Sequence, residues 1–128
     1  MKKIVLLIMA VATLVIANPV QAQEKAKWNE KEAFHEIMSK TFHPAEEGKL
    51  EPIKSRSAEM VDIATAWKNS TAPEGYNQKA IQKNLKSLVK DAKKLNRLVK
   101  KNAADADIKA QLVELHTLFH EITEKCEH

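Results

Sequence analysis

Histidine is the residue type in this 128-residue sequence whose spacing best suits a chemical role. The five histidines fall in two stretches near the ends of the chain: His35, His43, His116, His120 and His128. His116 and His120 are four residues apart, which places two imidazoles on one face of a helix, as in helical zinc sites. This spacing indicates a binding site for a transition-metal ion.

A third imidazole is expected from the other stretch. If the first and last helices are antiparallel neighbours, His35 and His116 lie at one level, and His120 lies about 6 Å further along the axis. Helical angles place all three on the flanks of the apolar faces. We therefore expect a metal site at the rim of the domain, formed by His35, His116 and His120. Three imidazoles suit zinc, copper or nickel and leave one coordination position open.

Other side chains near this site have weaker predicted roles. Glu36 and Glu121 are candidates for orienting an imidazole ring. His43, at the expected end of the first helix, either interacts with the helix dipole as a C-terminal cap or provides an additional ligand. Cys126 is either a buried core residue or, with His128, part of a second and weaker metal site. As the only cysteine, Cys126 has no partner for an internal disulfide.

Four helices must position these residues. Glycine and proline are scarce and mark boundaries, so that residues 24–42, 50–69, 76–102 and 105–127 remain uninterrupted. The short connections between them favour antiparallel neighbours. We predict an all-α fold, an antiparallel up-down-up-down four-helix bundle.

Apolar residues recur in each interval with the spacings of three and four that a bundle core requires. The first interval contains Phe34, Ile37, Met38 and Phe42, with Trp28 at the edge. The second contains Leu50, Ile53, Ser57, Met60, Ala64 and Trp67. The third contains Ile81, Leu85, Leu88, Ala92, Leu95 and Val99, and the fourth Ile108, Leu112, Leu115, Phe119, Ile122 and Cys126. Each stripe is predicted to face the core.

The start of the chain has the pattern of a secretory signal. Lys2 and Lys3 precede an apolar run over 4–17, and Val20-Gln21-Ala22 resembles a cleavage site. The run is shorter than the roughly 20 residues of a membrane span. We predict a signal peptide over 1–22 and one domain over 23–128, located in the periplasm or secreted, and not an integral membrane protein.

The third predicted helix is strongly basic. Between 79 and 101 its only acidic residue is Asp91, against nine basic ones: Lys79, Lys83, Lys86, Lys90, Lys93, Lys94, Arg97, Lys100 and Lys101. This face is either a solvated surface or a docking surface for an acidic protein partner or an anionic membrane. Nucleic acid is not expected, because no aromatic residues are interleaved for base stacking.

The signal peptide, the four helices and a histidine near the end of the last helix resemble the cytochrome b562 and cytochrome c′ superfamily of periplasmic bundles. Residues 112–120 are similar to the last helix of the member that binds haem non-covalently, with Phe119 before His120. The resemblance implies a b-type haem with His120 and either His35 or Met38 as axial ligands, and electron transfer as the function. No Cys-x-x-Cys-His motif is present, which excludes covalent attachment of the c type.

Three functions follow from these observations. The first is a periplasmic metal-binding bundle that buffers, carries or senses a transition metal. The second is a haem-binding electron carrier, and the third is a structural or chaperone-like bundle whose histidines are incidental. An enzyme is not expected, because no nucleophile motif accompanies the histidines.

Overall fold

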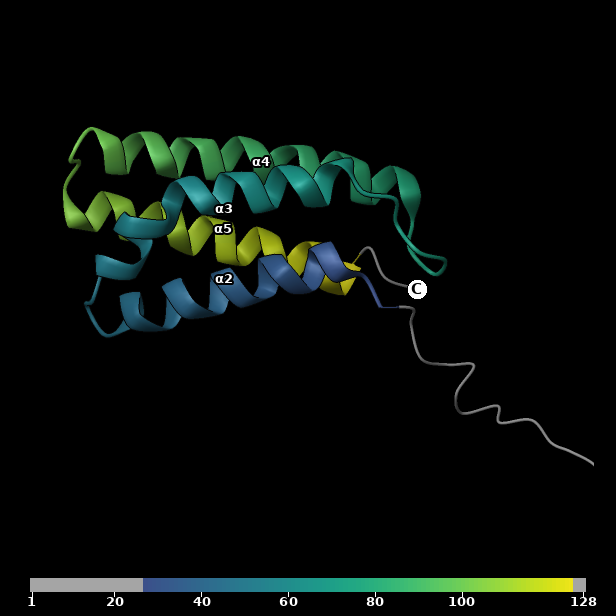
Figure 1. Cartoon of the computed structure of the whole chain (residues 1–128), viewed down its shortest axis with the longest axis horizontal. Coiled ribbons are helices and arrows are strands. Elements are labelled where there is room, and N and C mark those ends of the chain that lie inside the picture. The colour runs from purple at the N-terminus through teal and green to yellow at the C-terminus, as the bar shows by residue number, and fades with distance from the viewer. Residues whose placement is uncertain (1–26, 126–128) are drawn as a thin grey trace, which may run out of the picture.

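The computed structural model describes residues 27–125 and shows an antiparallel four-helix bundle (Figure 1). Its helices are α2 (Asn29–Glu46), α3 (Glu51–Asn69), α4 (Gln78–Lys100) and α5 (Asp105–Lys125). The predicted fold class is confirmed. The predicted signal peptide, Cys126 and His128 lie outside the described residues.

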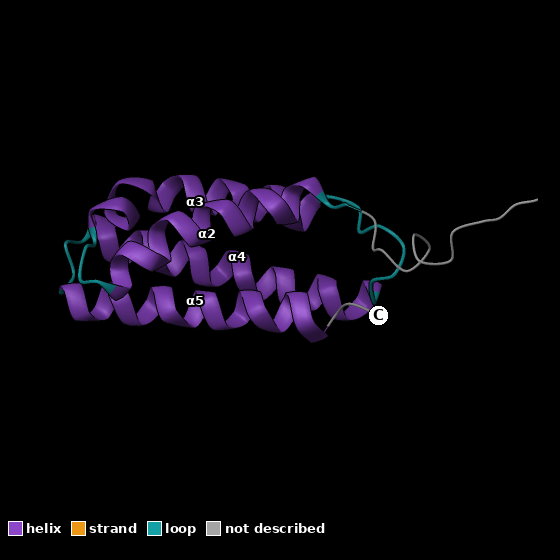
Figure 2. Cartoon of the chain, turned by 90° about the horizontal axis from the view of Figure 1, so that it is seen from below, coloured by secondary structure: helices purple, strands orange, loops and turns teal. Residues whose placement is uncertain are grey.

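Each helix packs beside the helix that follows it in the sequence, and the last helix packs beside the first. Helix α3 packs against α2 and α4, and α4 packs against α5. Helices α2 and α5 close the ring with the thinnest contact of the four, and Figure 2 shows the connecting loops confined to the two ends of the bundle. The thin contact therefore leaves room for a hollow between α2 and α5.

The predicted core stripes face inward. Within the described residues, every member of the four stripes is buried except Val99, which is partly exposed. Trp28, predicted at the edge of the first face, is 3% exposed. No helix within 27–125 carries an apolar stretch that would reach across a bilayer.

Helix α2 continues past its predicted end at 42 and contains Pro44. The lack of an N–H at Pro44 removes one helical hydrogen bond, but its fixed φ is compatible with the helix. Its carbonyl accepts the backbone N–H groups of Glu47 at 3.0 Å and Lys49 at 2.9 Å. The chain leaves the helix at Gly48, whose φ of 85° favours glycine. The extra turn brings His43 within the helix.

An aromatic cluster joins α2, α3 and α5 beside the histidines. Phe34 of α2 lies with its ring centroid 5.5 Å from that of Trp67 and 5.6 Å from that of Phe119. Trp28 packs edge-on against Trp67 at 5.8 Å, and its indole N–H donates to Ser70 Oγ at 2.8 Å. Packing of these large aromatic side chains sets the separation of α2 and α5.

Replacing Phe34 with Ala should lower the free energy of unfolding by about 3–5 kcal/mol, because the ring is fully buried between two other rings. Urea denaturation followed by circular dichroism measures the loss. Lys40→Ala, at an exposed position of the same helix, is the control and should cost less than about 0.5 kcal/mol. Equal losses for the two variants would contradict the conclusion that burial of Phe34 stabilises the bundle.

Candidate metal centre

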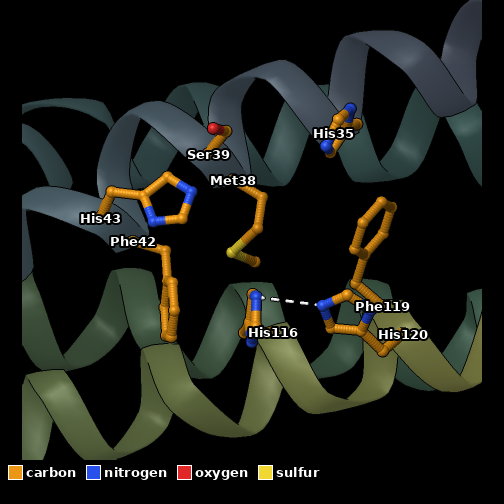
Figure 3. A pocket seen from close by; sticks show the side chains of 8 residues that line it. All are labelled: His35, Met38, Ser39, Phe42, His43, His116, Phe119 and His120. Carbon is orange, nitrogen blue, oxygen red and sulfur yellow. Dashed lines mark hydrogen bonds between the residues drawn. The ribbon is translucent and has the colours of Figure 1, made fainter. Parts of the chain in front are cut away.

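Four histidines and a methionine line one hollow between α2 and α5 (Figure 3). Its volume is about 200 Å³. The lining residues are His35, Met38, Ser39, Phe42, His43, His116, Phe119 and His120. The predicted location, at the rim between the first and last helices, is thus where the described histidines gather.

His116 and His120 form a close pair on one face of α5. Their Nε2 atoms lie 3.2 Å apart, and their rings are nearly perpendicular at 81°. Two nitrogens bound to one tetrahedral ion at about 2.0–2.1 Å are about 3.3 Å apart. The pair therefore already has the spacing that chelation of one ion requires.

Glu124 fixes the orientation of the His120 ring. Its Oε2 lies 3.1 Å from His120 Nδ1, and because a carboxylate only accepts, Nδ1 donates. In the neutral ring, Nε2 of His120 then carries the lone pair and accepts from Nε2–H of His116. The carboxylate thus orients His120 as in many metal-binding histidines, with its Nε2 lone pair directed at His116 until an ion replaces this hydrogen bond. His116 needs only to transfer its proton from Nε2 to Nδ1 to present a second one.

The surroundings of His116 favour its neutral form. It stacks on Phe42 with ring centroids 3.8 Å apart and an interplanar angle of 3°. Burial lowers the pKa of His116 below the ordinary histidine value, and the nearby His120 lowers it further, while Glu46 opposes this shift. The unprotonated form, which is the one that binds metals, is therefore favoured.

His35 lies apart from the pair. Its ring stacks on Phe119 with centroids 5.7 Å apart and an angle of 9°, so His35 is level with Phe119, whereas His116 is level with Phe42. The register between α2 and α5 differs from the expected one, which placed His35 level with His116. Within 27–125, no three histidine, cysteine or acidic side chains are grouped closely enough to hold one ion.

His43 belongs to the last turn of α2, and its exposed ring contacts Glu46, with Nδ1 3.3 Å from Oε1. It lines the same hollow as the His116 and His120 pair. The other proposed members of a second site, Cys126 and His128, fall beyond the last residue described.

Two contributors to the site were not recognised in the sequence. Glu124 contacts His120, and the His-x-x-x-Glu spacing on one helix face is the signal that could have identified it. Phe42, expected only as a core residue, also forms the surface on which His116 stacks. Sequence spacing does not show which ring will cover which, because that depends on the register of two separate helices.

The basic residues of α4 line two hollows that contain none of the histidines. Two hollows beside α3 and α4 are lined by Lys68, Gln82, Lys83, Lys86, Val89, Lys90 and Lys93. None of these described lining residues is acidic, so the ammonium groups around the hollows are not neutralised by a carboxylate in the lining. The lining of these two hollows is therefore basic.

The lowered pKa of His116 predicts how stability depends on pH. Because the folded state resists protonation of His116, the free energy of unfolding should fall as the pH drops below about 6.5, where the unfolded histidine gains its proton. Replacing His116 with Phe keeps a ring on Phe42 and removes this cost. Denaturant titrations between pH 7 and 5 should show a shallower fall for His116→Phe than for the parent; equal slopes would contradict the role of burial.

Comparison with known proteins leaves the site to be interpreted from its own geometry. No protein-family model matches the sequence, and no curated protein or solved structure matches the chain.

Proposed function

We propose that this protein binds a transition-metal ion in the hollow between α2 and α5, with Nε2 of His116 and Nε2 of His120 as its chelating donors. The observation that carries this proposal is the 3.2 Å separation of these atoms. His35, the third ligand expected from the sequence, stacks on Phe119 and is not grouped with the pair closely enough to hold one ion.

The environment of the pair supports metal binding over an incidental pairing of histidines. The Glu124 carboxylate orients one ring, and burial lowers the pKa of the other, which stacks on Phe42. Burial favours the neutral form of His116, and the carboxylate orients the His120 ring as in many metal-binding histidines. An isolated pair of solvent-exposed histidines would have neither feature.

The proposed role is reversible handling of the ion, by buffering, carriage or sensing. Two protein nitrogens leave coordination positions open, whereas structural zinc sites close all four with protein ligands. The hollow is at the rim, and the His120 side chain is 49% exposed, so an ion can enter and leave without opening the core. The predicted signal peptide would place this activity in the periplasm or outside the cell.

Haem binding, which the cytochrome resemblance implies, is the weaker proposal. The hollow of about 200 Å³ is smaller than the roughly 300–1,000 Å³ typical of sites for larger ligands. Phe34, Trp67 and Phe119 fill the adjacent space between the helices. The residues as they stand suit a single ion and do not provide a slot for a macrocycle.

The metal proposal is tested by calorimetric titration of the protein with Zn²⁺, Ni²⁺ and Cu²⁺. Replacing both His116 and His120 with Ala should weaken binding of the preferred ion at least about 100-fold, because both donors are lost. Glu124→Gln should weaken it about tenfold, since the His120 ring loses its orienting carboxylate.

His43→Ala provides the matched control, because His43 lines the same hollow but its ring contacts Glu46. Its affinity should stay within about twofold of the parent. Undiminished binding by the double variant would remove the proposed site, and a Soret band after haem addition, lost in His120→Ala, would favour the cytochrome reading instead.

We further propose that the basic surface of α3 and α4, defined by Lys68, Lys83, Lys86, Lys90 and Lys93 around the two hollows, docks an acidic protein partner. A local positive field without acidic lining residues speeds encounter with such a partner. The surface and the metal hollow involve different side chains, so an ion and a protein partner can be bound together.

Retention on immobilised polyglutamate tests this surface. Lys86→Glu combined with Lys90→Glu should elute at clearly lower salt than Lys40→Glu combined with Lys109→Glu, although both double variants change the net charge equally. The control lysines are exposed on α2 and α5. Identical elution would show that only net charge matters and would contradict a localised docking surface.

A further inference from the structure

Met38 contributes a sulfur atom to the hollow that holds the histidine pair. The side chain comes from α2, is 1% exposed, and lines the same hollow as His116 and His120. Figure 3 shows the Met38 sulfur in the space between α2 and α5. The sulfur lies on the same side of His116 as the Nε2 atom that faces His120. Thioether and imidazole donors from both closing helices are therefore directed into one small volume.

The charge of the hollow distinguishes between possible ions. Its described lining residues include histidine, methionine and serine but no carboxylate; Glu46 and Glu124 contact His43 and His120 at Nδ1, outside the lining. A divalent ion would keep its full double charge beside Phe42 and Phe119, whereas a monovalent ion requires less compensation. Low charge and an apolar surround thus favour a monovalent, soft ion.

Donor softness leads to the same class of ion. A thioether is a soft donor that selects Cu(I) among the biological transition metals, and imidazole also binds copper. Cu(I) accepts low coordination numbers, so two imidazoles and one thioether satisfy it. Zn²⁺ would find only two of the four ligands that it usually takes.

We propose that the site selects Cu(I), bound by Met38 Sδ together with Nε2 of His116 and His120. This inference rests on the metal site proposed above and adds the identity of the ion and its third donor. Binding is a ligation step with no change in oxidation state. An ion held in this way joins α2 to α5 across the thinnest helix contact of the bundle.

The test compares Cu(I), under anaerobic conditions, and Ag(I), its redox-stable analogue, with Zn²⁺ in competition titrations of the full chain. Met38→Leu conserves volume and should preserve the fold. It should weaken Cu(I) and Ag(I) at least about tenfold and change Zn²⁺ affinity less than about twofold. Met60→Leu, at a fully buried position of α3 outside the hollow, is the matched control and should change neither.

A second readout follows the sulfur directly. In protein labelled at its methionine methyl groups, Ag(I) should shift the Met38 methyl resonance at one equivalent and leave that of Met60 unchanged. If Met38→Leu binds Ag(I) as tightly as the parent while the His116 and His120 double Ala variant does not, the thioether inference falls and the metal site stands. If the double variant also retains Ag(I) and Zn²⁺ binding, the metal site itself falls.

Discussion

The structure depends on how α2 and α5 are held together, because they close the bundle through its thinnest contact. Rings meet across this closing pair: Phe34 and His35 against Phe119, and Phe42 against His116. Flat rings leave gaps at their edges that branched aliphatic side chains would fill. The histidine hollow is such a gap, so the contact that completes the fold also creates the candidate site.

The fold could be predicted because its information is local. Each helix repeats its apolar residues at spacings of three and four, and the scarce glycines and prolines mark the approximate helix boundaries in the sequence. The predicted end of α2 at 42 is too early, because Pro44 lies inside the helix and does not break it. A proline in the last turn loses one hydrogen bond and still allows its own carbonyl to accept two.

The site was less predictable because it depends on the relation between two helices. The His116 and His120 pair follows from helical periodicity alone, and the structure places these nitrogens together. Whether His35 meets them depends on the axial register of α2 against α5, and large rings fix that register. Phe42 stacks on His116, and His35 stacks on Phe119. The spacing of residues within one helix does not predict such contacts between two helices.

The placement of both imidazoles on a single turn of α5 has a kinetic consequence. Their spacing is set by the helix backbone, so it survives fluctuations in which α2 moves away from α5. Under the proposed function, an ion would meet two donors already in place on α5 before any donor from α2. In the proposed site Met38, on the other helix, would then be the last donor to join, although it comes first in the sequence.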